Sequence, residues 1–179
     1  MIIAEAGRAL RERKISVAEL TKEALAAAAR ANSGLNAFIT ITEETALKRA
    51  AELDEDLTRG IDHGPLHGIP VAHKDAFYTK GVRTTAGTKI LSDFVPEEDA
   101  DLVERLRKAG TIMIGKTNLH ELCHGITSNN PQYAAGMRME PPVSVPVARG
   151  TIPAANAAPD PPLDPPGIRV TSQGFLTAP

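Results

Sequence analysis

Two short apolar segments, each followed by a lysine, constrain the fold of this chain more than any other feature. The first, residues 69–72 (IPVA), leads to Lys74, and the second, residues 111–115 (TIMIG), leads to Lys116. The long connection between them contains a helical pattern that Asp99 can cap and that closes at Gly110. Two apolar strands joined by such a crossover are best placed parallel in one sheet, with helices on its faces. We therefore predict an α/β fold, in which a mixed or parallel central sheet is flanked by helices and both lysines lie at the same edge.

The residues before this pair predict further helices and one strand. After an N-terminal helical segment, Ser16 and Glu19 form a capping box that starts a helix over residues 17–31, which Gly34 ends. The β-branched alternation of residues 35–42 (LNAFITIT) predicts a strand. Apolar residues at helical spacing then continue to a stop at Gly60, which predicts another helix before the first apolar segment.

The composition changes after about Gly136. Ten of the 14 prolines lie between Pro141 and Pro179, and this stretch contains no lysine and no glutamate. Consecutive prolines neither continue a helix nor fit a central strand. We therefore predict a folded part over residues 1–136 and an irregular, proline-rich tail over residues 137–179.

Charge and cysteine content argue against several kinds of partner. A formal net charge of -2 gives no electrostatic case for binding nucleic acid or an anionic membrane. The sequence contains no apolar run of about 20 residues, and Glu5 and Arg8 interrupt any signal peptide. The single cysteine, Cys123, excludes an internal disulfide and suits a reducing compartment. We expect a cytoplasmic protein with neither a nucleic-acid nor a membrane partner.

Lys74 is the first candidate for chemistry. Apolar residues precede it at 71–72 and follow it at 76–77, and such surroundings can desolvate an ammonium group. Desolvation lowers the pKa of a lysine from about 10.4 toward neutrality, which is what a general base requires. Asp75 would oppose this shift if it lay alongside, but adjacent side chains of an extended segment point to opposite faces. A surface lysine at a strand end fits the same local sequence, so both interpretations stay open at this level.

Several separate blocks of the chain resemble the amidase signature family. In the family's order they are GPLHGIPVAHKD (64–75), TKGVRTTAGTKIL (79–91), DADLVERLRKAGTIMIGKTNLHEL (99–122) and SNNP (128–131). The resemblance includes the helical N-terminus and extends to about residue 135. The family contains general amide hydrolases and the A subunit of glutamyl-tRNA(Gln) amidotransferase. Its fold is a central mixed sheet wrapped by helices, in agreement with the fold predicted from the strand pattern.

The resemblance also implies a mechanism, a Ser-cisSer-Lys triad whose base falls on Lys74. The neutral lysine accepts a proton through the middle serine, so that the nucleophilic serine attacks the carbonyl of a small-molecule amide. Lys116 is expected to be a strand-end residue of the same sheet rather than a triad member. The family implies no cofactor. It implies partner subunits if the setting is that of an amidotransferase, and it leaves a homo-oligomer open.

Both serines of the implied triad are missing. Where a GGSSGG-like loop is expected, residues 145–158 read VPVARGTIPAANAA, and where the nucleophile is expected, residues 164–169 read DPPGIR. The glycine amides of an oxyanion hole are missing with them. We therefore expect residues 1–136 to be the N-terminal portion of an amidase-signature domain, with an incomplete sheet and no activity. A shifted reading frame or a misjoined gene end would explain residues 137–179.

Ser128 and Asn129 are candidates for substrate binding. In the family their loop lies close to the catalytic edge, so the resemblance implies contact with substrate. Hydrogen bonds to the local backbone explain an Asn-rich turn equally well. No catalytic role is expected for Ser128.

A zinc site is the competing interpretation. His120, Glu121 and His124 form the pattern H-E-x-x-H, which on a helix places two imidazoles on one face beside a general base. The candidate helix, residues 119–124, is cut short by Asn118 and Gly125, and no convincing third ligand follows. Three hypotheses therefore stand: an amide hydrolase fragment that binds no metal, a zinc-dependent hydrolase, and a non-catalytic protein that keeps the amidase N-terminus as a binding module.

Overall fold

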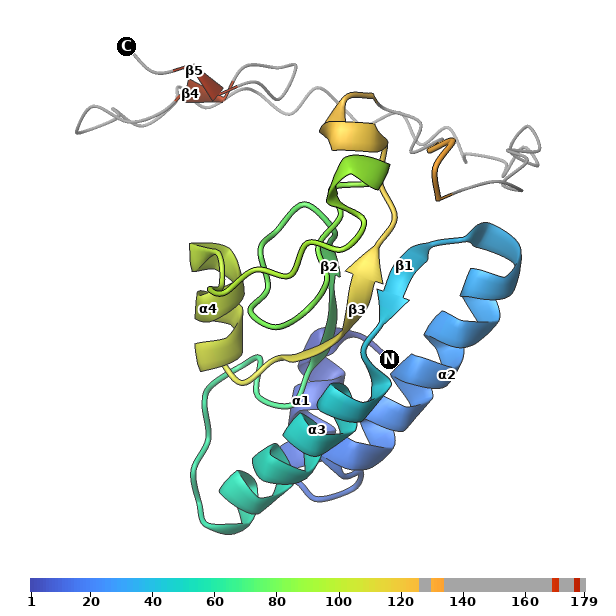
Figure 1. Cartoon of the computed structure of the whole chain (residues 1–179). Coiled ribbons are helices and arrows are strands. Elements are labelled where there is room, and N and C mark those ends of the chain that lie inside the picture. The colour runs from blue at the N-terminus through green and yellow to red at the C-terminus, as the bar shows by residue number, and fades with distance from the viewer. Residues whose placement is uncertain (126–129, 134–168, 171–175, 178–179) are drawn as a thin grey trace, which may run out of the picture. The chain divides into compact units, whose positions relative to one another are not determined.

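The structure, a computed structural model, describes residues 1–125, 130–133, 169–170 and 176–177 (Figure 1). The chain divides into two compact units, Met1–Met139 and Glu140–Pro179. In the second unit the described residues form β4 (Arg169–Val170) and β5 (Leu176–Thr177), which pair antiparallel. The predicted division at residue 136 and the predicted irregular tail fall mostly on residues outside the described ones. Both stay predictions.

The first unit is built on a three-stranded mixed sheet. Its strands are β1 (Phe38–Ile41), β2 (Pro70–Lys74) and β3 (Ile112–Thr117), in the order β1-β3-β2. As predicted from the crossover, β2 and β3 are parallel, with Lys74 opposite Thr117, while β1 and β3 are antiparallel. The α/β prediction with a mixed central sheet is confirmed.

Gly115 allows β1 to approach β3 closely. A Cβ atom at this position would lie 2.5 Å from the carbonyl oxygen of Thr40 and 2.9 Å from the Phe38 ring. Those distances are well inside van der Waals contact, so only glycine fits between the two strands. The strand pairing that holds the sheet together therefore depends on a residue without a side chain.

Helices surround this sheet. They are α1 (Ile3–Arg11), α2 (Val17–Leu35), α3 (Glu43–Thr58) and α4 (Asp101–Lys108). The predicted capping box of α2 is present, since Ser16 Oγ accepts from the Glu19 amide at 3.1 Å and Glu19 Oε2 accepts from the Ser16 amide at 2.8 Å. The helix continues past Gly34 and ends where Asn36 adopts a left-handed conformation, with φ 50°.

The start of α4 differs from the prediction that Asp99 caps it. The N-cap residue is Ala100, and the helix begins at Asp101. Asp99 instead accepts a hydrogen bond from the backbone amide of Lys80 at 2.7 Å and lies 3.4 Å from Arg107 Nε. Its carboxylate therefore joins α4 to the preceding loop, which is a tertiary role that the capping pattern did not indicate.

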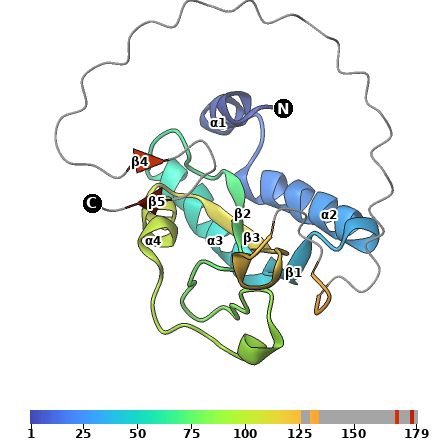
Figure 2. The ribbon, with the colours of Figure 1, turned by 90° about the horizontal axis from the view of Figure 1, so that it is seen from above.

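The core is aliphatic and lies between the helices and the sheet. It joins buried residues of α1, α2 and α3 to those of β3 and to Ile69 beside β2; Leu10, Val17, Leu53 and Ile112 are almost completely buried. Because the sequence contains few aromatic residues, the core is packed from Leu, Ile, Val and Ala. In Figure 2, α1 and the short helix η1 (Lys89–Leu91) lie on opposite sides of the sheet.

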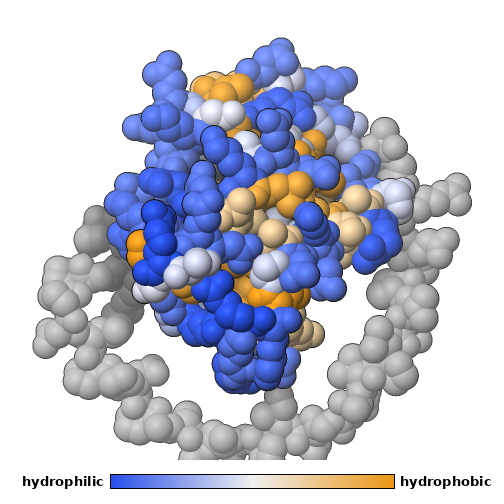
Figure 3. All heavy atoms as spheres, turned by 90° about the horizontal axis from the view of Figure 1, so that it is seen from below, coloured by the Kyte–Doolittle hydropathy of each residue, from blue (hydrophilic) through white to orange (hydrophobic). Residues whose placement is uncertain are grey.

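Part of the apolar surface of the first unit is exposed. Ile90 is 87% exposed, and Phe77, Tyr78, Val95 and Leu102 are also exposed. On the face drawn in Figure 3, apolar atoms gather into patches between hydrophilic side chains. Among the described residues, the structure contains no helix with the length and apolar character that crossing a membrane requires.

Candidate active site

Lys74 is the last residue of β2, at the carboxyl end of the strand. Burial alternates along this end of the chain: His73 and Asp75 are buried, whereas Lys74 between them is exposed. The expectation that Lys74 and Asp75 point to opposite faces agrees with this pattern. The expectation that apolar neighbours desolvate Lys74 disagrees with it, because the alternation along the strand places the ammonium group at the surface. Lys74 is accessible to another molecule at this edge.

Asp75 turns into the interior and organises the loop that follows β2. Its Oδ2 accepts hydrogen bonds from the Thr85 amide at 2.8 Å and from Thr85 Oγ1 at 2.5 Å. Its backbone amide donates to the Thr117 carbonyl at 3.1 Å and so extends the pairing with β3 by one residue. The carboxylate is fully buried, so it requires a cation nearby.

Lys116 supplies that cation. Its Nζ lies 3.3 Å from Asp75 Oδ1, donates to the Phe77 carbonyl at 2.9 Å and donates to Thr84 Oγ1 at 2.5 Å. The side chain has no exposed surface. Burial lowers the pKa of Lys116 from its usual range, while the carboxylate of Asp75 acts in the opposite direction. Lys116 was expected only as a strand-end residue, and its role as a buried ion-pair partner was missed.

One signal in the sequence could have identified this pair. Asp75 directly follows the first of two strands that were predicted to be parallel neighbours, and Lys116 ends the second. The carboxyl ends of such strands meet at one edge, so opposite charges there are expected to lie close together. Asp75, the carboxylate next to Lys74, is therefore the expected ion-pair partner of Lys116.

The zincin geometry is not present. Residues Glu121–Cys123 form a short 3₁₀ helix, η2, in which Leu122 and Cys123 have left-handed φ angles of 52° and 62°. The predicted α-helix over residues 119–124 is therefore wrong, and His120 and His124 do not share a helical face. The Leu122 amide donates to the Ala86 carbonyl at 2.8 Å, a tertiary bond that replaces a helical one. In the part of the chain that the structure describes, no three His, Cys, Asp or Glu side chains are grouped to hold a metal ion.

Ser128 and Asn129 lie outside the described residues, so their contact with substrate stays a prediction. The next residue, Asn130, is described and fully buried. Its Nδ2 donates to the carbonyls of Gly87 at 2.6 Å and Leu119 at 2.8 Å, and its Oδ1 accepts from the Gln132 amide at 2.8 Å. Asn130 therefore fastens this segment to the loop after β2.

Comparison with known proteins decides the family. The model of the family described as Amidase matches residues 19–153. The chain belongs to the amidase family. The resemblance of the motifs was expected to stop at about residue 135, but the match continues to residue 153. It therefore includes part of the predicted tail.

Several relatives of this amidase-family chain are similar over most of its length. The A subunit of glutamyl-tRNA(Gln) amidotransferase from Methylococcus capsulatus is 41% identical over 155 residues, which are 87% of this chain and 30% of the relative. The corresponding protein from Azoarcus sp. is 46% identical over 133 residues, 74% of this chain and 27% of the relative. The solved peptide amidase from Stenotrophomonas maltophilia is 38% identical with a TM-score of 0.63, over 66% of this chain and 25% of that protein.

These relatives are much longer than the chain. It spans 27–30% of the length of the two amidotransferase proteins that it matches. The part that matches the family model contains β1, β2 and β3 with α3, α4 and most of α2. The family membership thus rests on the part of the fold that carries Lys74 and the buried ion pair.

Proposed function

We propose that this chain carries the base of an amide-hydrolysing site, with Lys74 as the lysine of a Ser-cisSer-Lys triad. The observation that supports this most directly is the place of Lys74, exposed at the carboxyl end of β2 within the region that matches the amidase family. Chemistry in sheets of this kind gathers outside the carboxyl ends of the strands. In the reaction, the neutral lysine accepts a proton through the middle serine while the first serine attacks the carboxamide carbon.

The buried ion pair supports this role by positioning Lys74. Asp75 directly follows Lys74, and Lys116 Nζ reaches its Oδ1 at 3.3 Å from the neighbouring strand. Together with the Thr85 and Phe77 contacts, the pair holds the backbone that follows Lys74 in a defined geometry.

We further propose that the 179-residue chain alone does not hydrolyse amides. The sequence offers neither a GGSSGG-like loop nor a serine in the DPPGIR segment, so the nucleophile and the relay serine have to come from elsewhere. Ser128 and Asn129 remain proposed substrate contacts. Because two relatives carry the name of an amidotransferase component, we propose a cytoplasmic setting in which partner subunits are available.

A chimera tests the role of Lys74. Residues 1–136 of this chain are joined to the remainder of the S. maltophilia peptide amidase, and ammonia release from a peptide amide is measured. We expect the chimera to be active and Lys74→Ala to lower its rate by about 100-fold or more. Lys89→Ala, at an exposed lysine outside β2, is the matched control and should keep the parent rate.

Two results would contradict the proposal. One is an active, folded chimera whose rate does not change in Lys74→Ala, because Lys74 would then not be the base. The other is labelling of the isolated 179-residue chain by a serine-reactive fluorophosphonate, which would show a nucleophile that the sequence does not reveal. Circular dichroism of each variant separates loss of chemistry from loss of fold.

A further inference from the structure

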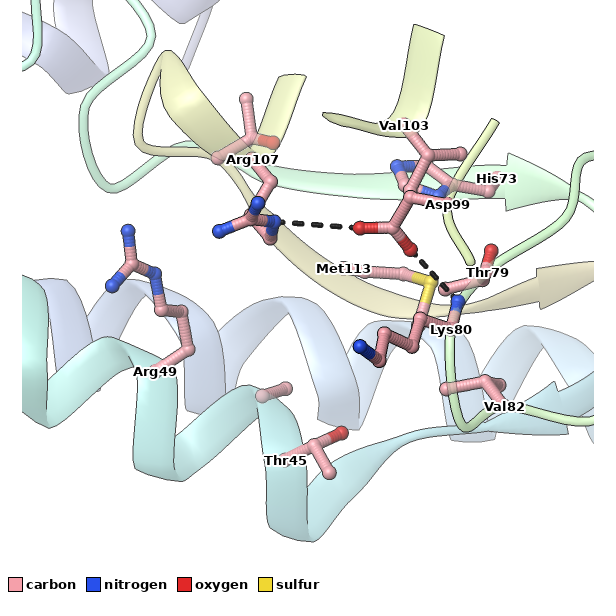
Figure 4. A pocket seen from close by; sticks show the side chains of 12 residues that line it. Thr45, Arg49, His73, Thr79, Lys80, Val82, Asp99, Val103, Arg107 and Met113 are labelled. Atoms are coloured by element: carbon pink, nitrogen blue, oxygen red, sulfur yellow. Dashed lines mark hydrogen bonds and ion pairs between the residues drawn. The ribbon is translucent and has the colours of Figure 1, made fainter. Parts of the chain in front are cut away.

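A cavity of about 530 Å³ lies beside the sheet, apart from Lys74. It is lined by residues of α3, the end of β2, the loop after β2, and α4 with the start of β3 (Figure 4). Its apolar wall consists of Ala46, Val82, Val103 and Met113. Neither Lys74 nor any residue of the Asp75–Lys116 pair lines it, so this space is separate from the candidate active site.

Three cationic side chains surround the cavity. Arg49 of α3, Arg107 of α4 and Lys80 of the loop after β2 all line it (Figure 4). Two carboxylates compensate part of this charge: Asp99 lies 3.4 Å from Arg107 Nε, and Glu52 accepts from Arg49 Nη1 at 3.0 Å. Three positive charges against two negative ones leave about one positive charge without a local partner, and that excess suits a ligand with a single negative charge.

Two buried polar groups at the cavity also lack partners. His73 is 7% exposed, and neither of its ring nitrogens has a hydrogen-bond partner among the described residues. Arg49 Nε is likewise buried without a partner there. Buried polar atoms are nearly always satisfied, so an unsatisfied pair at one cavity indicates a group that arrives from outside. Burial lowers the pKa of His73, as does the charge of Lys116, so the ring offers one donor and one acceptor near neutral pH.

We propose that this cavity binds a small organic carboxylate whose apolar body packs on Met113, Val82 and Val103. A carboxylate carries one charge and accepts in the planar, two-oxygen geometry that guanidinium groups donate to. Phosphate would bring nearly two charges and no apolar body, so it matches the charge and the apolar wall less well. This is the site that a non-catalytic binding module, the third hypothesis from the sequence, would use.

Hexanoate is the probe for this site. Calorimetry on the whole 179-residue chain compares it with hexanamide and hexan-1-ol, which have the same apolar body without charge, and with inorganic phosphate. We expect one hexanoate per chain, bound about tenfold tighter than either neutral analogue. Saturable hexanoate binding that is no tighter than hexanamide, or phosphate binding tighter than hexanoate, would overturn the carboxylate assignment, and so would no binding.

Substitutions test whether hexanoate binds in this cavity. Arg107→Gln should weaken hexanoate about fivefold, whereas Arg105→Gln on the same helix, outside the cavity, should not change it. Thr45→Glu places a carboxylate at the rim in the first turn of α3, where glutamate is compatible with the helix, and should abolish binding. Equal affinity of Arg107→Gln and Arg105→Gln, or unchanged binding by Thr45→Glu, would show that hexanoate binds elsewhere and would overturn the proposal.

Discussion

Lys116 Nζ lies 3.3 Å from Asp75 Oδ1, and both side chains are completely buried. The two residues are far apart in the sequence, and two neighbouring strands bring them together: Asp75 comes just after β2, and Lys116 lies near the end of β3. The pair closes the carboxyl edge of the sheet from inside. Lys74, between two buried residues, is left facing outward.

Breaking this pair should destabilise the fold strongly. Lys116→Met leaves the Asp75 carboxylate buried without its cation, and such a change lowers the free energy of unfolding by about 3–5 kcal/mol. The double variant Asp75→Asn/Lys116→Met removes both charges and should recover a large part of this loss. Urea unfolding followed by circular dichroism measures all three proteins. A loss below about 1 kcal/mol for Lys116→Met would mean that water or another cation reaches Asp75.

Acidification should lower stability through His67. The ring is buried, its Nδ1 accepts from the His63 amide at 3.1 Å, and its Nε2 lies 3.0 Å from the Leu53 carbonyl, so the neutral ring satisfies both contacts. Burial lowers the pKa of His67 below its ordinary value of 6.5. Below pH 6.5 the unfolded chain therefore binds more protons than the folded one, and the free energy of unfolding falls as the pH falls toward the folded pKa.

Urea unfolding between pH 7.5 and pH 5.5 measures this slope. His67→Gln should flatten the profile, although not completely, because burial lowers the pKa of His73 in the same direction. His124→Gln, at an exposed ring, is the control and should keep the parent slope. If the free energy of unfolding of His67→Gln keeps the pH dependence of the parent protein, a group other than His67 causes that dependence.

Two glycine substitutions should act in opposite directions. Gly115→Ala drives a methyl group into the Thr40 carbonyl and should lower the free energy of unfolding by about 1–3 kcal/mol. Gly34→Ala lies within α2, where an added Cβ meets nothing within 4 Å, and should raise it by about 0.5–1 kcal/mol. Thermal unfolding of both variants tests the close approach of β1 to β3. A neutral Gly115→Ala would mean that β1 moves away at little cost.

Removing the side-chain amide of Asn130 should loosen the loops at the carboxyl edge of the sheet. Asn130→Ala leaves the Gly87 and Leu119 carbonyls without their donor in a buried place, which should lower the free energy of unfolding by about 2 kcal/mol. Hydrogen exchange should show faster exchange at the Gly87 and Tyr133 amides than in the parent protein. Gln132→Ala, in the same turn but partly exposed, should change neither measurement.

The exposed apolar side chains should make the chain bind hydrophobic dyes. Ile90 is 87% exposed, and Phe77 and Tyr78 are exposed nearby in the sequence. We expect fluorescence enhancement of an anilinonaphthalene dye under native conditions, reduced in Ile90→Lys. No enhancement together with two-state unfolding would contradict the expected incomplete burial of this surface.

Local and regular features of the fold could be predicted from the sequence. The Ser16–Glu19 box uses contacts three residues apart, and the parallel pairing of β2 with β3 follows from two apolar strands and a crossover. The end of α2 was placed too early, because the turn depends on Asn36 in the left-handed conformation rather than on Gly34. Element boundaries of this kind depend on single φ angles.

Features that rest on distant partners were not predicted. Lys116 resembles a solvent-facing strand end until the carboxylate of Asp75 and the hydroxyl of Thr84 come beside it. In the same way, Asp54 accepts from the first amides of α2, at Val17 and Ala18, across a long stretch of chain. The H-E-x-x-H pattern failed as a helix because the Leu122 amide bonds to Ala86 instead. Periodicity carries no information about such contacts.

The order of strands in the sheet also determines when this fold can form on the ribosome. Both β1 and β2 pair only with β3 in the described sheet, and β3 is the last of the three to be synthesised. Until residues 112–117 have left the exit tunnel, the two earlier strands have no hydrogen-bonding partner from this sheet. Between the synthesis of β2 and that of β3 the nascent chain therefore carries two unpaired strands, and in this period a chaperone that binds extended apolar segments would protect it.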